Sequence, residues 1–400
     1  MSDAPGIVLC TLRYSDNLGD GVIGDSLAWM LGQVRPGWTV GHFDLAGRTG
    51  FAPRDAVALS PAKRLFYALP APLRACAMRL AWPRLRRRVS AAWEAGARRP
   101  GYRMIVGGGQ VVSDIALNFP LKFDLLSRRL AADAAPVAVY AVGVSSSFSA
   151  AGRRLFQDAF DRLDLRWFGA RDADSLGHLR ARFSLAPCSP RKTIDPAVWA
   201  ADAYGVARAA NARPRIGIGV AHPLELGAHA SAPGAHGEDA AFAFLEALVR
   251  GLAARGLAPV LFNNGSAEDQ LFTDKVAARL RAAGAAGFDM AARPRVPAEL
   301  VSTIAGFDAI VAHRLHANIV AFSLGIPAVG MRWDRKVESF FAETGRGGYC
   351  IGSFADAGAA LALVERALGG HRAAQDAARL AELKAFAMAE LELLAQALDA

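Results

Sequence analysis

The chain has 400 residues, a hydrophobic fraction of 53%, a charged fraction of 21% and a formal net charge of +9. This composition is typical of a globular protein and excludes a disordered chain, and the length predicts two domains. No apolar run approaches the ~20 residues that a membrane span needs, and polar residues after Met1 lead directly into a strand. We therefore expect a cytoplasmic protein without an export signal or a spanning helix.

The cysteines do not form a metal-binding or disulfide pattern. They are Cys10, Cys76, Cys188 and Cys350, far apart in the sequence and without a CxxC pair. This spacing disfavours a zinc site or a disulfide framework and is typical of a reducing compartment.

Short apolar segments alternate with amphipathic helical patterns along the chain, which predicts α/β domains with parallel sheets covered by helices. In the first half, strands are predicted over 6–12, 38–43, 103–106, 137–142 and 165–169. In the second half they are predicted over 215–220, 258–262, 307–312 and 326–331.

The periodicity lapses around 200–214, which predicts a domain boundary. We expect a first Rossmann-like domain over 1–205, a second over 213–370, and a C-terminal helix over 371–400 with an Ala/Leu/Glu pattern. The stretch 222–237 is rich in Gly, Ala, Ser, Pro and His and is expected to be a mobile loop.

A glycine-containing turn follows the first strand and leads into a helix, so backbone N–H groups could receive an anion there. Asn17, Gly19 and Asp20 belong to it. Gly19, Gly21 and Gly24 also satisfy GxGxxG, and Asp44 ends the next strand, where a ribose-binding acid would lie. A site for NAD or FAD is thus one alternative, although Asp20 would place a carboxylate beside the pyrophosphate. A tight turn without a ligand is another.

Two more such turns close neighbouring strands. Gly108 and Gly109 follow the third strand, and Ser145 follows Gly143 after the fourth. Each turn alone is weak evidence for a ligand site, because glycines also occur wherever the backbone adopts a positive φ angle. Together the turns predict a common crevice. Arg171 after the fifth strand is either an exposed residue beside a helix cap or an anion clamp directed into this crevice.

The segment His313-Arg314-Leu315-His316 is the strongest sequence signal, because it lies where a strand of the second half leads into a helix. That edge of an open α/β sheet is where ligands bind. With Lys336 one strand later, two imidazoles and two cations could surround a small anionic substrate. We expect substrate contact from His316, whereas His313 could equally be a structural residue.

The basic charge is concentrated in the amphipathic segment 61–100, which holds ten basic residues and one acid, a net charge equal to that of the whole chain. Aromatic and leucine residues are interspersed among the arginines. Helices packed on the domain with solvated cationic ends would explain this pattern, and so would a surface for anionic membranes at the inner face of the cytoplasmic membrane. No nucleic acid-binding motif is present, and nucleic acid is not expected as a partner.

Taken in order, these motifs resemble the polysaccharide pyruvyl transferase family over roughly 7–345. The matching residues are Asn17-Leu18-Gly19-Asp20 with Ile23, Gly107-Gly108-Gly109, Gly143 with its serines, Arg171-Asp172 with Ser175, Asp195-Pro196, Arg314-Leu315-His316, Gly325-Ile326-Pro327, Asp334, Lys336 and Val337. The resemblance implies a GT-B-like fold, with two Rossmann-like domains facing across a cleft and a terminal helix returning to the first domain. It also implies transfer of pyruvate from phosphoenolpyruvate to two hydroxyls of a saccharide as a cyclic ketal, in polysaccharide or cell-envelope glycan biosynthesis.

By that resemblance Arg314 would hold the anionic groups of the donor, His316 would be the general acid, and Arg171 would clamp from the other domain. Asn17 and Asp20 would line the substrate side, and we assign Asp20 as the general base. Imidazole suits the acid because it titrates near neutrality. We expect no metal and no cofactor, with phosphoenolpyruvate as donor and a saccharide, free or lipid-linked, as acceptor.

Three other functions fit parts of the sequence. A GT-B glycosyltransferase would bind a sugar nucleotide in the same cleft. An oxidoreductase would use the GxGxxG turn for NAD or FAD. A non-catalytic binder of anionic polymers or membranes would depend on the basic segment alone.

Overall fold

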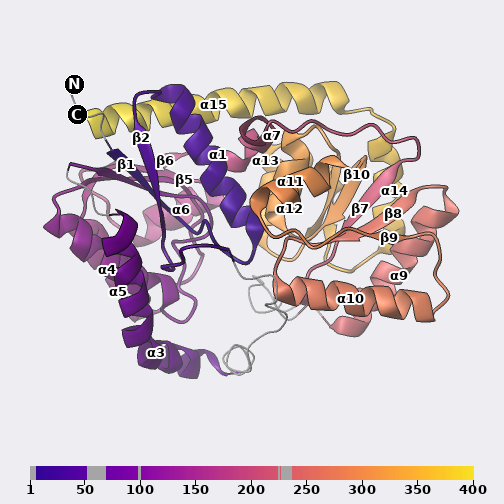
Figure 1. Ribbon diagram of the computed structural model, residues 1–400, viewed down its shortest axis with the longest axis horizontal. Helices are drawn as coiled ribbons and strands as arrows, with labels where there is room; N and C mark the ends of the chain where they lie inside the picture. The colour runs from indigo at the N-terminus through magenta and orange to yellow at the C-terminus, as the bar shows by residue number, and fades with distance from the viewer. Residues whose placement is uncertain (1–5, 52–68, 98–100, 224–225, 227–236) are drawn as a thin grey trace.

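The computed structural model describes residues 6–51, 69–97, 101–223, 226 and 237–400, and shows two α/β lobes side by side (Figure 1). Each lobe holds a six-stranded sheet, with strand orders β2-β1-β3-β4-β5-β6 and β12-β11-β10-β7-β8-β9. Every strand pairing is parallel. The predicted fold class, with two Rossmann-like domains, is confirmed.

The first sheet and its helices come from the N-terminal half. In chain order they are β1 (Gly6–Thr11), α1 (Leu18–Val34), β2 (Thr39–Asp44), α3 (Ala71–Ala92), the π-helical turn η1 (Trp93–Ala97), β3 (Arg103–Gly107), α4 (Asn118–Ala132), β4 (Pro136–Val142), α5 (Ala150–Arg162), β5 (Asp164–Ala170), α6 (Ala173–Arg182), β6 (Arg191–Lys192), the 3-10 turn η2 (Pro196–Trp199) and α7 (Ala200–Tyr204).

The second sheet follows. Its elements are β7 (Arg215–Gly219), α9 (Glu238–Ala254), β8 (Ala258–Phe262), α10 (Ala267–Ala282), β9 (Asp289–Met290), α11 (Pro297–Ala305), β10 (Ala309–Ala312), α12 (Leu315–Ser323), β11 (Ala328–Arg332), α13 (Arg335–Glu343), the 3-10 turn η3 (Gly347–Tyr349), β12 (Cys350–Gly352), α14 (Ala357–Leu368) and the long α15 (Ala373–Asp399).

Every strand predicted from the sequence is present, with bounds shifted by at most two residues. The sequence did not predict β9 or β12 and placed only a strand-like segment near β6. These three strands have two or three residues and lie at sheet edges, where one neighbour is missing and a long apolar run is unnecessary.

The chain order places two switch points at the centre of the molecule. In the first sheet the chain moves from β1 outward to β2 and then returns to β3 on the other side of β1. In the second sheet the same reversal separates β7 from β10. Loops at the carboxyl ends of strands beside such a reversal form a crevice, so the turns after β1, β3 and β10 are placed to form a site.

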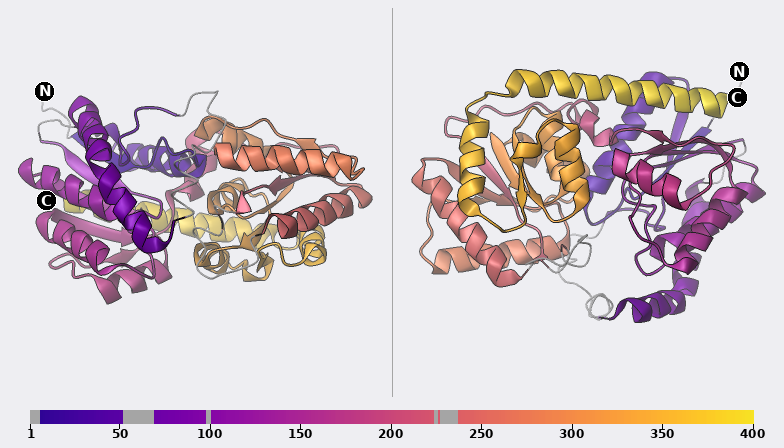
Figure 2. Two further views of the ribbon diagram at one scale, coloured as in Figure 1. Left: turned by 90° about the horizontal axis from the view of Figure 1, so that it is seen from below. Right: turned by 180° about the vertical axis from the view of Figure 1, so that it is seen from behind.

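Helix α15 links the two lobes. Figures 1 and 2 show it running along one side of both, and its buried residues Leu391 and Leu394 join one apolar cluster that contains Leu9 of β1 and Ile310 of β10. The Tyr140 hydroxyl of β4 also donates a 2.9 Å hydrogen bond to the Ala387 carbonyl of α15. The lobes therefore share a continuous apolar core on this side.

The basic segment contributes α3, which lies on the opposite side of the molecule from α15, as Figure 1 and the right view of Figure 2 show. The rest of this segment includes 61–68 and 98–100, outside the described residues, as is most of the predicted loop 222–237. Among the helices that the structure describes, none is long and apolar enough to span a membrane.

Candidate active site

A cavity of about 630 Å³ lies between the lobes and is lined by residues from both. The predicted site residues that border it are Asn17, Asp20, Ser145 and Arg171 from the first lobe and Arg314, His316 and Lys336 from the second. These residues follow β1, β4, β5, β10 and β11, so the edge predicted from the sequence is where the side chains converge.

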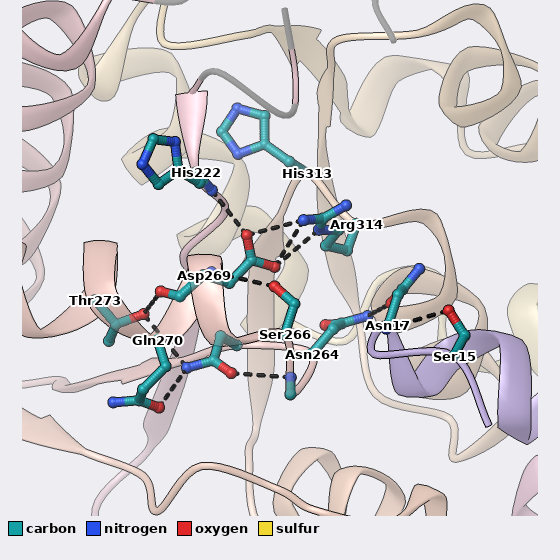
Figure 3. Close-up of polar contacts among 12 residues, drawn as sticks. Ser15, Asn17, His222, Asn264, Ser266, Asp269, Gln270, Thr273, His313 and Arg314 are labelled. Carbon is teal, nitrogen blue, oxygen red and sulfur yellow. Dashed lines mark hydrogen bonds and ion pairs between the residues drawn. The ribbon is translucent and has the colours of Figure 1, made fainter. Parts of the chain in front are cut away.

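Arg314 is fixed by a buried carboxylate. Its Nε donates to Asp269 Oδ2 at 3.0 Å and its Nη2 donates to both oxygens at 2.8 Å (Figure 3). Asp269 lies in the first turn of α10 and also accepts a 2.8 Å hydrogen bond from the His222 backbone N–H. A two-point contact to a planar guanidinium sets its direction, so Arg314 is held at the cavity in one orientation.

His316 faces a second buried carboxylate across the lobes. Its Nε2 lies 3.5 Å from Oδ2 of Asp195, at the start of η2. This separation is longer than a good hydrogen bond, and neither atom has another hydrogen-bond partner within the described part of the chain. The pair is one that substrate binding could tighten, as occurs in many catalytic sites.

Gly19 lies against the other side of the same imidazole. A Cβ at this position would lie 2.4 Å from His316 Cβ and 2.7 Å from its Nδ1. Only a residue without a side chain fits, so Gly19 permits the first turn of α1 to meet α12. Nε2 of the ring faces Asp195, and Nδ1 lies on the side of the ring that faces Gly19.

Arg171 and Lys336 bring further positive charge from opposite lobes. Arg171 is buried, with its Nε 3.3 Å from Asp172 Oδ2 and its Nη1 3.9 Å from Asp195 Oδ2. Asp172 caps α6 by accepting from the Ser175 N–H at 2.7 Å. Arg171 is thus a buried side chain that borders the cavity and not the exposed arginine of the alternative interpretation.

Lys336 reaches the first lobe through a polar chain. Its Nζ donates to Gln110 Oε1 at 3.3 Å, and Gln110 Nε2 donates to Ser145 Oγ at 3.2 Å. The ammonium also lies 4.3 Å from the centre of the Trp333 ring, a favourable cation–π position. The contact between Lys336 and Gln110 joins the two lobes across the cavity.

The surroundings shift two ionisation equilibria at the site. Burial lowers the pKa of Lys336, and the charges of Arg171 and Arg314 lower it further, while Asp334 and Asp20 oppose the shift. Burial by itself would raise the pKa of Asp195, but the contact and charge of His316 and the charge of Arg171 outweigh it and lower that pKa. Asp195 is therefore ionised beside His316 near neutral pH.

Asp20 differs from the other carboxylates of the site. It borders the cavity in the first turn of α1, and no residue in the described ranges donates a hydrogen bond to its carboxylate, whereas Asp172 and Asp334 cap helices. Asn17 at the same turn accepts from Asn264 of the second lobe at 3.4 Å. Asp20 thus has its carboxylate available to a ligand.

Some predicted contacts lie elsewhere. His313 is buried outside the cavity lining, with its Nε2 3.0 Å from Ser353 Oγ and its ring 4.4 Å from that of Phe354, and Figure 3 shows its ring turned away from the Arg314 guanidinium. Since β10 ends at Ala312, the next two side chains diverge, and the structure assigns His313 the structural role. Gly108 and Gly109 have φ angles of 68° and 71° and form the turn, with Gly108 against Ile23, outside the lining.

The dinucleotide interpretation does not agree with this geometry. The space beside Gly19, where a pyrophosphate would lie, is taken by His316. The Asp44 carboxylate, which would bind a ribose, accepts hydrogen bonds from the Tyr14 and Ala46 backbone at 2.9 and 2.8 Å. These residues shape the turn and the lobe interface.

The sequence did not assign roles to Asp195, Asp269 or Gln110, which orient the predicted residues. Asp195-Pro196 was visible as a motif. Ser266, three residues before Asp269, caps α10 by accepting a hydrogen bond from the Asp269 N–H at 3.1 Å, and this spacing is a capping pattern that the sequence contains. Nothing in the sequence paired either acid with its partner. In the described ranges, no group of three or more His, Cys, Asp or Glu side chains is arranged for a metal ion.

The family model for polysaccharide pyruvyl transferase matches residues 17–335, from the turn after β1 to the start of α13. The chain belongs to this family. The match includes both lobes and every cavity residue discussed above except Lys336, one position beyond its end. The resemblance drawn from the sequence is thereby confirmed. No curated protein matches the sequence.

Solved structures of other enzymes share the fold of this pyruvyl transferase family member. An α,α-trehalose 6-phosphate synthase from Burkholderia multivorans has 12% identity and a TM-score of 0.55, with 99% of this chain and 98% of that chain covered. A UDP-GlcNAc 2-epimerase from Methanocaldococcus jannaschii, in complex with UDP-GlcNAc and UDP, has 9% identity and a TM-score of 0.53, with 92% and 93% covered. At such identities the likeness establishes the two-domain GT-B arrangement and nothing about substrates.

Proposed function

We propose that this transferase moves pyruvate from phosphoenolpyruvate to two hydroxyls of a saccharide and forms a cyclic ketal. The observation that carries the proposal is the convergence of Arg171, Arg314 and Lys336 from both lobes beside His316 at one cavity. Phosphoenolpyruvate carries a carboxylate and a phosphate, which guanidinium and ammonium groups bind. The proposed transfer uses no cofactor.

The first step requires a proton donor beside the enol carbon. His316 Nδ1 gives a proton to the methylene carbon of phosphoenolpyruvate, and the electron-deficient carbon that results is attacked by the first saccharide hydroxyl. Asp195 stabilises the charged imidazole before the transfer and keeps Nε2–H in place after it. Asp195 acts through His316 and is a positioning residue.

The second step releases phosphate and closes the ketal. The carbon–oxygen bond to phosphate breaks and the second hydroxyl attacks the same carbon. Asp20, the base we assign, accepts the hydroxyl protons in turn; one of them restores the proton that His316 gave to the methylene carbon, and the other leaves with phosphate. Arg171, Arg314 and Lys336 offset the charge that develops on phosphate. One phosphoenolpyruvate and one diol give one ketal and one phosphate.

The direct experiment incubates the protein with phosphoenolpyruvate and candidate saccharide acceptors and follows phosphate release together with the acceptor mass. The proposal predicts phosphate release that requires the acceptor, with a mass gain equal to a pyruvate ketal. Release of a nucleoside diphosphate from a sugar nucleotide, with no reaction of phosphoenolpyruvate, would contradict it.

Lys336 predicts how donor affinity depends on pH. Because its pKa is lowered, Lys336 is charged below that pKa and loses its charge as pH rises through it, earlier than an ordinary lysine near 10.4. The affinity for phosphoenolpyruvate is expected to fall over this alkaline range in titration calorimetry. Lys336→Arg keeps its charge and should abolish the fall; an identical pH profile for both proteins would exclude this role of Lys336.

We also propose that α3 places the enzyme on an anionic membrane, where a lipid-linked acceptor would be found. The described helix has no acidic residue, exposes Leu73 and Leu80 at 52% and 83%, and carries exposed arginines. These are Arg79, Arg84, Arg86, Arg87 and Arg88. Apolar side chains among cations are typical of a helix lying at a headgroup surface.

Changing Arg84, Arg86 and Arg87 to glutamine together is expected to weaken binding to anionic liposomes by about 100-fold, at about 1 kcal/mol for each cation. Co-sedimentation at physiological salt measures it. Changing Lys275, Arg279 and Arg281 of α10 to glutamine provides a matched control and should have little effect. Liposomes that fail to retain the wild-type protein would rule out this surface.

A further inference from the structure

A second group of cations lies where the turn after β2 meets α3 and α4, and one of its members lines the same cavity. Arg48 lines the cavity, as does Phe119 of α4, and Lys122 Nζ lies 5.3 Å from the centre of the Phe119 ring. Arg88 of α3 donates from Nε to the Ala46 carbonyl at 3.1 Å. None of these cations belongs to the group around His316.

The backbone of the turn after β2 packs closely against α3. Gly47 has a φ of 67°, and a Cβ there would lie 2.7 Å from Val89 Cα. Only glycine allows the turn to pack directly on the α3 backbone. This contact places Arg48 of the turn beside Arg88 of the helix.

Lys122 is buried, with 6% of its surface exposed, yet no described residue accepts a hydrogen bond from its Nζ. The Nη1 of Arg48 is also buried without a hydrogen-bond partner in those ranges, 3.9 Å from Asp44 Oδ2. Among the described residues, Asp44 is the carboxylate whose charge acts on Lys122, and its oxygens already accept two backbone hydrogen bonds. Arg48 and Lys122 therefore share one carboxylate whose oxygens already accept other hydrogen bonds.

Such an arrangement is costly without a ligand, because buried charges need partners. The pKa of Lys122 reflects these surroundings. Burial lowers it most, the charges of Arg48 and Arg88 lower it further, and the charge of Asp44 opposes the shift, so that the pKa falls to about 8. An anion between Arg48 and Lys122 would supply the missing hydrogen bonds and restore the full charge of the lysine.

We propose that Arg48 and Lys122 bind a phosphate or diphosphate group carried by the acceptor saccharide. This deepens the proposed function and depends on it for the identity of the acceptor. A cavity of about 630 Å³ is in the range that holds drug-sized ligands and exceeds the needs of a three-carbon acid phosphate. The Arg48 region then holds the anionic end of the acceptor while its diol meets the donor near His316.

The test titrates inorganic pyrophosphate into the full-length protein by calorimetry, with saturating phosphoenolpyruvate to fill the donor site. Lys122→Met and Arg48→Gln are each expected to weaken pyrophosphate binding at least about tenfold and to leave phosphoenolpyruvate affinity within about twofold. Arg128→Gln, on the exposed side of α4 and paired with Asp124, is the matched control and should bind as the wild type does. Should Lys122→Met fail to fold, Arg48→Gln decides alone.

Two esters then identify the carrier. Tighter binding of farnesyl diphosphate than of pyrophosphate would indicate a lipid carrier. Tighter binding of UDP than of pyrophosphate would indicate a nucleotide carrier. Either result supports the site if the tighter binding is lost in Lys122→Met. If phosphoenolpyruvate does not bind but pyrophosphate binding still requires Lys122, the donor assignment fails while the anion site stands. Equal pyrophosphate affinity in the wild type and both variants would overturn the inference.

Discussion

Replacing His316 by alanine is expected to lower turnover by about 100-fold or more, which is the usual contribution of a general acid. The loss follows from the proposed role of the ring: Nε2 faces the Asp195 carboxylate, and Nδ1 is the nitrogen to which we assign the proton transfer. Initial rates of phosphate release at saturating phosphoenolpyruvate measure the effect. Thermal unfolding of the variant shows that the fold is retained.

His178 provides the matched control, because it also borders the cavity but its Nδ1 lies 3.1 Å from the Val144 carbonyl. His178→Ala should keep turnover within a few-fold of the wild type. Asp195→Asn should lower turnover less than His316→Ala and should also change the pH profile, since a neutral amide no longer stabilises the imidazolium. Near-normal turnover of His316→Ala would show that His316 is not the general acid.

Replacing Asp269 by alanine is expected to reduce the free energy of unfolding by about 3–5 kcal/mol. Asp269 is completely buried and is held by the Arg314 guanidinium and the His222 N–H. In the variant, the Arg314 guanidinium, which is only 13% exposed, keeps its charge but loses the carboxylate that pairs with it. Urea denaturation followed by circular dichroism measures the loss.

Asp274 is the control on the same helix, because its exposed carboxylate accepts only from Gln270 at 2.7 Å among the described residues. Asp274→Ala should change the free energy of unfolding by less than about 0.5 kcal/mol. Donor affinity should fall in Asp269→Ala but not in Asp274→Ala, because Asp269 also orients Arg314. A stability loss below about 1 kcal/mol in Asp269→Ala would show that the ion pair is not what fixes Arg314.

The central strands were predictable because burial on both faces demands short continuous apolar runs, such as 137–142 and 258–262. The edge strands β9 and β12 were not, because a strand of two or three residues leaves no periodic signal. The Rossmann-like class followed from the alternation of strands and helices.

The site was predictable only in part. Arg314, His316 and Arg171 could be placed at strand ends, which share one sheet edge in each lobe. Their partners Asp269 and Asp195 come from distant segments, and only tertiary packing brings them within contact. The role of His313 stayed open for a related reason: adjacent positions at a strand end point in different directions, and the sequence does not specify which one faces the cavity.

The central claim is that cations of both lobes form one site for phosphoenolpyruvate, and titration calorimetry with this compound tests it most directly. The account predicts saturable binding of one phosphoenolpyruvate per chain, weakened about tenfold or more in Arg171→Gln and equally dependent on Lys336 of the other lobe. Absence of saturable phosphoenolpyruvate binding, with a sugar nucleotide bound instead in a manner that requires Arg171, would contradict it.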